Sequence, residues 1–292
     1  MLVGIFSIEL FNGDFNFNYF YCRFHSSLRH RNMCTSSVQL FKQRLKYARF
    51  KGASDEVIAE LERKVKESEE LERIPKLYVA NAFQHPSMAV LSIEDNQIDL
   101  RKHFWGLIPP FVKSEVEARE LWNKTINARG ESIFDKPAFS HAANFSRCIV
   151  PLDGYFEYHH RHGKTFPYLI RQEDESMMYV GGLTAKWTAP SSGKLVRTFT
   201  LITTPATDFL AEIHNNPKRE DARMPLLLEP ENIEQWLNGS VDEAKSLIKT
   251  NEITLKAHTV NKLMGKESKG NTPEALESHD YPELQSLPGL FD

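Results

Sequence analysis

The sequence predicts an α+β protein: a single compact domain with a β-rich, partly closed antiparallel core and peripheral helices. Short β-like runs bounded by turn residues recur between Leu77 and Leu228, and few helical stretches separate them. Neither an internal repeat nor a low-complexity linker divides the chain. With 292 residues, 41% of them apolar, the chain can bury a substantial core.

The N-terminal region has two parts. Residues 1–32 are rich in Phe, Tyr and Asn without a helical period. We interpret them as an upstream extension, either a start codon assigned too early or a leader that is removed; an extra strand or a partner-binding arm is the alternative. From Val38 to Glu72 apolar residues recur at helical spacing, which predicts a helical hairpin or one kinked helix. We expect the domain proper to span residues 33–275, followed by a loop-rich tail at 276–292.

Strands and short helices alternate after residue 76. Helices are predicted over Glu115–Asn123, capped by Ser114, and over Glu229–Leu237, with Pro230 in the first turn. The predicted strands are Leu77–Ala80, Met88–Ile93, Arg147–Val150, Tyr168–Arg171, Met178–Gly182, Thr198–Thr203, Pro225–Leu228 and Ile253–Val260.

Composition excludes several classes of protein. The net charge of −3 excludes a bulk polycation, so nucleic-acid binding would need a local basic patch. Three widely spaced cysteines indicate a reducing, cytoplasmic compartment rather than a disulfide framework. No apolar run reaches the roughly 20 residues of a membrane span, and the start lacks the features of a secretory signal.

Met33-Cys34 is the first candidate for chemistry. If translation begins at Met33 and the methionine is removed, Cys34 becomes the N-terminal residue. Its thiol and α-amine then lie on adjacent carbons and can condense with an aldehyde to a thiazolidine ring. An α-amine titrates near about pH 8, so part of it is neutral and nucleophilic at physiological pH. The alternative is an ordinary small core residue.

Two further motifs carry groups suited to a nucleic acid. Trp105, in the run Trp105–Pro109, can stack on a base, and Gly106 permits close backbone approach. In the run Asn127–Glu131, Asn127 can orient a ligand and Arg129 can form a forked contact with a phosphate. The alternatives are a core tryptophan and a capped turn with a surface ion pair.

The remaining motifs supply acid–base groups. Glu157 stands among aromatic residues in the run Arg147–Tyr158, where desolvation favours the protonated form that a general acid needs. His214 can transfer protons or stabilise an anion, and Arg223 adds a cation. An exposed edge-strand glutamate and a histidine that only bonds the backbone are the alternatives.

These motifs, in the order in which they occur along the chain, resemble those of the SOS response-associated peptidase (SRAP) family, also called abasic site processing proteins. The resemblance spans roughly residues 33–275. The matching pieces are Met33-Cys34, Trp105–Pro109, Asn127–Glu131, Arg147–Tyr158, Ile213-His214 and Arg223-Met224-Pro225. The resemblance implies a SRAP-like fold with a positively charged groove. It also implies a protein that acts on single-stranded DNA containing abasic sites. We further expect a monomer that needs no cofactor or metal and does not bind membranes.

The resemblance also implies roles for individual residues. Cys34 would form the thiazolidine with the opened sugar, Glu157 would act as general acid and base, and His214 would assist proton transfer. Asn127 would position the amine or the sugar. Removal of the residues ahead of Cys34 and cleavage at the imine stage, a lyase activity, are further implied. The expected DNA contacts are Arg129 and Arg223 with phosphates and Trp105 beside the bases.

This sequence departs from the family pattern in four places. Thr35-Ser36 follows the cysteine where a Gly-Arg pair is common, with Lys42, Arg44 and Lys46 as candidates to replace that arginine. Tyr158 stands where tryptophan is frequent. Residues 215–222 are inserted before Arg223. With residues 1–32 attached, Cys34 has no free amine.

Two other functions remain open from the residues alone. One is a single-stranded DNA-binding module without covalent chemistry, which would act by stacking and phosphate contacts. The other is a metalloprotein built on His159, His160 and His162, although no Cys or carboxylate partner stands at convincing metal-ligand spacing.

Overall fold

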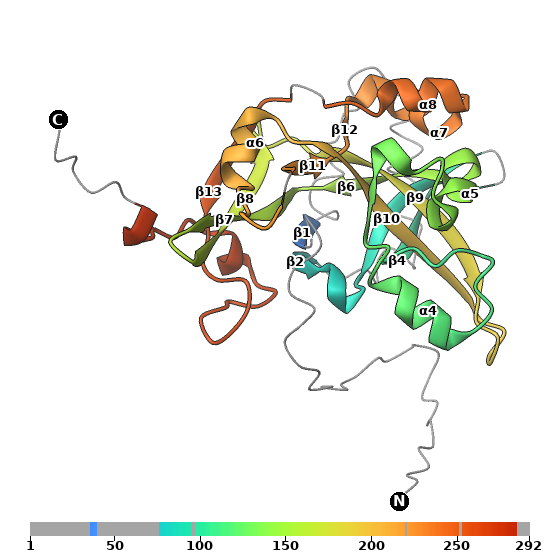
Figure 1. Cartoon of the computed structure of the whole chain (residues 1–292), viewed down its shortest axis with the longest axis horizontal. Coiled ribbons are helices and arrows are strands. Elements are labelled where there is room, and N and C mark those ends of the chain that lie inside the picture. Colours follow the sequence, from blue (N-terminus) through green and yellow to red (C-terminus); the bar gives the residue numbers. More distant parts are fainter. Residues whose placement is uncertain (1–35, 40–75, 95–96, 220, 251–252, 285–292) are drawn as a thin grey trace, which may run out of the picture. The chain divides into compact units, whose positions relative to one another are not determined.

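Strands dominate the part of the chain that the computed structural model describes, residues 36–39, 76–94, 97–219, 221–250 and 253–284 (Figure 1). These ranges belong to one unit, Asn32–Asp292. The helices are α4 (Glu115–Trp122), α5 (Pro137–Phe145), α6 (Asp208–Ile213), α7 (Ile233–Asn238) and α8 (Val241–Leu247). The strands are β1 (Ser36–Gln39), β2 (Leu77–Asn81), β3 (Ser87–Glu94), β4 (Gln97–Trp105), β5 (Asn127–Arg129), β6 (Arg147–Leu152), β7 (Gly154–Arg161), β8 (Lys164–Gln172), β9 (Met178–Thr188), β10 (Leu195–Pro205), β11 (Arg223–Pro225), β12 (Leu227–Leu228) and β13 (Leu255–Thr259).

Five strands of the larger sheet close into a ring. β10 pairs with β4, β4 with β3, β3 with β6, β6 with β9, and β9 returns to β10. Four of these pairings are antiparallel, and the fifth, β10 with β4, is a short parallel contact in which Thr198 and Phe199 lie opposite Phe104 and Trp105. The predicted α+β class with a β-rich, partly closed core is thus confirmed. The parallel closure between strands distant in sequence was not predicted, because local patterns carry no information on such pairings.

The second sheet contains β1, the first described strand after Cys34 in the sequence. Its order is β13-β8-β7-β1-β2, and every neighbouring pair is antiparallel. β1 lies between β7 and β2, and all four of its residues are buried. Gln39 fixes β1 to the ring, because its side-chain amide donates to the carbonyls of Ala89 and Pro151 at 3.0 and 2.9 Å and accepts from the Ala89 N–H at 2.8 Å.

The helix predicted from Val38 to Glu72 is wrong at its start. Val38 and Gln39 belong to β1, because hydrogen bonding to strands on both sides outweighs the local helical period. Residues 40–72 lie outside the described part of the chain.

Other local predictions agree more closely with the structure. The Ser114 hydroxyl accepts from the Glu117 N–H at 3.2 Å and begins α4, as its position predicts. The helix predicted over Glu229–Leu237 is a 3-10 turn, Pro230–Asn232, that continues into α7. The strand predicted over Ile253–Val260 is the shorter β13. The sequence did not predict α5, α6 or α8, which have nine, six and seven residues and therefore too few turns for a clear period.

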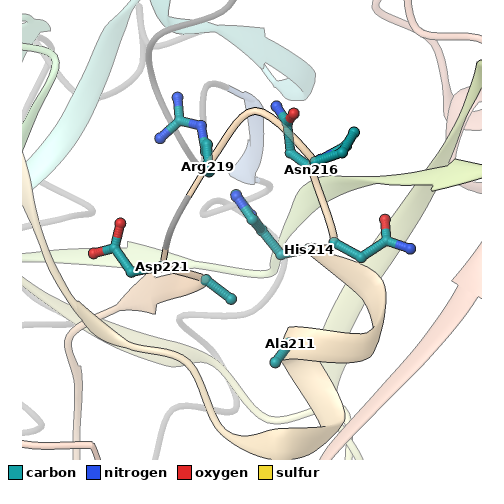
Figure 2. Close-up of a pocket in the computed structure, with 8 residues that line it drawn as sticks. Ala211, His214, Asn216, Arg219 and Asp221 are labelled. Carbon is teal, nitrogen blue, oxygen red and sulfur yellow. The ribbon is translucent and has the colours of Figure 1, made fainter.

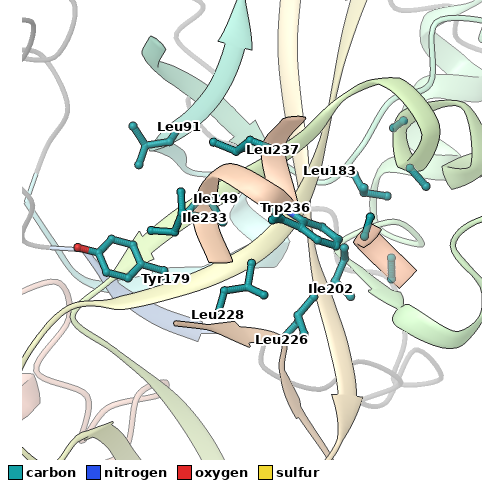
Figure 3. Close-up of a cluster of buried hydrophobic side chains, with 14 of the residues drawn as sticks. Leu91, Ile149, Tyr179, Leu183, Ile202, Leu226, Leu228, Ile233, Trp236 and Leu237 are labelled. Carbon is teal, nitrogen blue, oxygen red and sulfur yellow. The ribbon is translucent and has the colours of Figure 1, made fainter. Parts of the chain in front are cut away.

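Side chains alternate between two apolar clusters along β6. Cys148, Val150 and Leu152 pack in one cluster and Ile149 in the other, as the twofold period of a strand requires. In the second cluster the indole of Trp236 in α7 lies over the sheet, and its Nε1 donates to the Cys148 carbonyl at 2.8 Å (Figure 3). The helix is thereby fixed by both burial and a hydrogen bond.

Candidate active site

Glu157 and His214 form a buried hydrogen-bonded pair. Glu157 lies in β7, opposite Tyr168 of β8, and His214 is the residue that ends α6. His214 Nδ1 is 2.8 Å from Glu157 Oε2, and each side chain is 6% exposed. A carboxylate at Nδ1 orients the ring and selects the tautomer in which Nε2 can accept a proton.

Contacts between β7 and the end of α6 hold this pair in place. Thr207 caps α6 at its start, and the His214 N–H donates to the Leu210 carbonyl at 2.7 Å as the helix ends. The side chain of Asn215 accepts from the His160 N–H at 2.6 Å and donates to the His160 carbonyl at 3.0 Å. His214 is therefore positioned by a neighbour that bridges directly to the strand carrying Glu157.

A cavity of about 280 Å³ lies beside the pair (Figure 2). Nε2 of His214 is buried and has no hydrogen-bond partner in the described structure. Figure 2 shows the His214 ring between Arg219 and Asn216. A buried nitrogen without a protein partner is available to accept a proton or a hydrogen bond, as an acid–base role requires. The lining residues are Ala211, His214, Asn215, Asn216, Pro217, Arg219, Asp221 and Ala222.

Sequence reasoning missed most of this lining. The segment 215–222 is recognisable from sequence only as an insertion. No motif in it indicates that Asn216, Arg219 and Asp221 would face a cavity beside Glu157. Only the length of the insertion and its position directly after His214 could have pointed to it.

Arg223 is buried and bonded to protein acceptors. Its side chain is 3% exposed. Nη2 donates to Glu131 Oε2 at 2.6 Å and to the Thr203 carbonyl at 2.7 Å, and Nε donates to Thr203 Oγ1 at 3.2 Å. These protein acceptors surround its guanidinium group, and the predicted phosphate contact of Arg223 stays a prediction.

Arg129 and Asn127 come from β5, which pairs with β10. The Arg129 side chain is 52% exposed, and its Nη2 lies 3.1 Å from Oδ1 of Asp221. Asn127 is half-buried opposite Leu201 and does not line the cavity. The roles predicted for both residues stay predictions.

Trp105 belongs to the core. Its side chain is 0% exposed, stacks on Phe199 with ring centroids 5.9 Å apart, and donates from Nε1 to the Ile126 carbonyl at 2.9 Å. The prediction that it packs beside DNA bases is therefore wrong. Gly106 has a φ of +105°, and a Cβ there would lie 2.3 Å from Cδ1 of Trp122, so the close approach that this glycine permits is to an indole of the same chain.

Cys34 lies outside the described residues. The described chain begins two residues later at Ser36, which pairs with Phe156, the neighbour of Glu157 in β7. Consecutive Cα atoms are about 3.8 Å apart, so chain geometry limits the separation of the Cys34 and Ser36 Cα atoms to about 7 Å.

The histidines considered as metal ligands have other contacts. Nδ1 of His159 is 3.0 Å from the Glu212 carbonyl, and His160 uses its backbone to bind Asn215. Among the described residues, no group of three or more His, Cys, Asp or Glu side chains is arranged to hold a metal ion. None of the helices in this part of the chain is long and apolar enough to cross a membrane.

Comparison with known proteins identifies the class. The family model described as SOS response associated peptidase (SRAP) matches residues 41–267, and the chain belongs to this family. The range includes Glu157 and His214, whereas Cys34 precedes it.

Individual relatives agree with this assignment. Abasic site processing protein YoqW of Bacillus subtilis (strain 168) is 34% identical over 201 residues, which cover 66% of this chain and 84% of that protein. Abasic site processing protein HMCES of Gallus gallus is 27% identical over 216 residues, 66% of this chain and 60% of that protein. The crystal structure of a protein from Bacteroides thetaiotaomicron has a TM-score of 0.68 at 30% identity and covers 84% of this chain and 100% of that one.

Proposed function

We propose that this protein processes abasic sites in single-stranded DNA by bonding covalently to the opened sugar through Cys34 as its N-terminal residue. The observation that carries the proposal is the buried Glu157–His214 pair, whose unpartnered Nε2 lies at a cavity. Two relatives described above are named abasic site processing proteins, which supports the same substrate class.

The reaction needs an acid and an aminothiol. An abasic sugar is mostly a closed hemiacetal, and protonation of its ring oxygen by the Glu157–His214 pair releases the aldehyde. The Cys34 amine adds to the aldehyde carbon, and loss of water gives an imine. The thiol sulfur then adds to the same carbon and closes the thiazolidine, so that one water is released overall. Elimination of the 3′ phosphate from the imine would be the lyase branch.

The position of β1 supports Cys34 as the nucleophile. Ser36 pairs with Phe156, and Cys34 stands only two residues before it, so the covalent chain keeps the cysteine close to the strand of Glu157. A free amine requires that the residues before Cys34 are absent or removed. We propose that the same thiol and acid–base pair take part in hydrolysing the preceding peptide bond, which consumes one water.

Mass spectrometry of the full chain tests the proposal. The intact mass is measured alone and after mixing with a single-stranded oligonucleotide that carries one abasic site. We expect a species that begins at Cys34 and a heat-stable DNA adduct that is lost in Cys34→Ala. Cys148→Ala is the matched control, because the Cys148 thiol is 0% exposed and should not react. An intact leader, with no adduct even from a chain begun at Met33, would leave a noncovalent DNA-binding module as the function.

A further inference from the structure

The cavity beside His214 is built largely by the inserted segment. Apart from His214 and Ala211, its lining residues lie between Asn215 and Ala222. The His214 side chain is 6% exposed, and its Nε2 has no hydrogen-bond partner among the described residues. A volume of about 280 Å³ is just below the usual range of small-molecule sites and is large enough for a sugar phosphate.

Three arginines surround this region but differ in position. Arg223 is enclosed by Glu131 and Thr203. Arg129 lies against Asp221, and Arg219 lines the cavity itself. Its position makes Arg219 the best placed of the three to meet a ligand that also reaches His214.

The charged groups around Arg219 are of both signs. Burial lowers the pKa of Arg219, while Glu157 and Asp221 oppose this shift and Arg129 adds to it. Arginine remains charged under such conditions, and its guanidinium group matches the geometry of phosphate oxygens. A bound phosphate would replace the solvation that Arg219 loses by lying at the cavity.

We infer that Arg219, which the inserted segment supplies to the cavity, binds the phosphate next to the abasic sugar. This inference rests on the proposed function. The phosphate contact would hold the strand while the sugar lies at His214 Nε2. The inserted segment would thereby supply a DNA-binding arginine in a chain that has Thr35-Ser36 after its cysteine.

A binding experiment on the full chain tests this role. The probe is a single-stranded oligonucleotide with one tetrahydrofuran residue, an abasic analogue that lacks the aldehyde and cannot be crosslinked. We expect Arg219→Gln to weaken binding about tenfold and to lower the slope of log K against log salt by about 0.7, as for one lost phosphate contact. Lys218→Gln removes the same charge from the neighbouring position, which does not line the cavity, and should change binding less than twofold.

Replacing single phosphates by uncharged methylphosphonates shows which phosphate Arg219 contacts. Methylphosphonates replace, one at a time, the two phosphates that flank the analogue. In wild-type protein one replacement should weaken binding about tenfold, and in Arg219→Gln the same replacement should have little further effect. Equal losses in Arg219→Gln and Lys218→Gln, or additive effects of the variant and both methylphosphonates, would overturn the inference. Failure of the proposed function is recognised separately, by the absence of an adduct between wild-type protein and true abasic DNA.

Discussion

His214 Nδ1 lies 2.8 Å from Glu157 Oε2, although 57 positions separate the two residues in the sequence. The pair is buried, and His214 also lines a cavity. A carboxylate, an imidazole and an open space in this order form a path for moving a proton to or from a bound molecule.

Glu157→Gln tests this path. Glutamine keeps the size of the side chain and can still contact His214, but it cannot exchange a proton. We expect the rate of adduct formation with abasic single-stranded DNA to fall at least about 100-fold, measured on denaturing gels. Glu212→Gln, on the exposed side of α6, is the control and should keep the wild-type rate. A Glu157→Gln rate within threefold of wild type would exclude proton transfer by Glu157.

Asn215 should act as a positioning residue. Asn215→Ala removes both side-chain hydrogen bonds to the backbone of His160 and releases the segment that follows His214. We expect crosslinking at saturating DNA to slow about tenfold, since the bonds orient His214, while binding of the unreactive tetrahydrofuran oligonucleotide weakens by a smaller factor because Arg219 is retained. A cost in unfolding free energy of about 1 kcal/mol is expected for these exposed bonds. Parallel losses in rate and binding would contradict this role.

The free energy of unfolding should decrease at acidic pH because of the buried side chain of His103. The side chain is 1% exposed, and burial lowers its pKa from 6.5 to about 4. Between these values the unfolded chain binds a proton that the folded chain does not, so stability is complete above about pH 6.5 and decreases as the pH falls towards 4. At pH 5 the loss from this residue is about 2 kcal/mol.

Urea unfolding at pH 7 and pH 5 checks this expectation. His103→Gln removes the titrating group, and the difference between the two pH values should shrink by about 2 kcal/mol relative to wild type. His258→Gln, at a half-buried histidine in β13, is the comparison and should keep the wild-type difference. An unchanged pH dependence in His103→Gln would show that other groups cause the acid-side loss.

Gly106→Ala should destabilise the fold. The residue has a φ of +105°, and the new Cβ would lie 2.3 Å from Cδ1 of Trp122. Backbone strain and the clash together should lower the unfolding free energy by about 2 to 4 kcal/mol in thermal or urea denaturation. Gly193→Ala shares a positive φ, +66°, but meets nothing within 4 Å, so only the backbone cost of about 1 kcal/mol is expected. Equal losses at both positions would rule out the steric contribution of Trp122.

Sequence patterns predicted the local parts of the molecule better than its long-range contacts. Ser114 could be recognised as a helix cap because the bond it makes spans three residues. Glu157 and His214 were both candidate acid–base groups, but their hydrogen bond depends on how α6 packs against β7, which no local period encodes. Trp105 was misread for the same reason, because its burial depends on Phe199 and on ring closure by β10.

The insertion shows a further limit of sequence patterns. Arg223 carried the recognisable motif, whereas Arg219 lies in a segment without one, and the structure places Arg219 at the cavity. Which of two neighbouring arginines lines the cavity depends on the path of the chain after α6, and charge alone does not reveal it.

The interior position of β1 has a mechanical consequence. This strand is hydrogen-bonded on both sides, by β7 and β2, and Gln39 ties it to the ring of the other sheet. A DNA strand attached to Cys34 would transmit any pulling force into an element held by two rows of hydrogen bonds. If a motor enzyme pulls on that DNA, the force should break the hydrogen bonds that β1 makes to β7 and β2. We therefore expect pulling to unfold the protein, because β1 is an interior strand and not a detachable terminal segment.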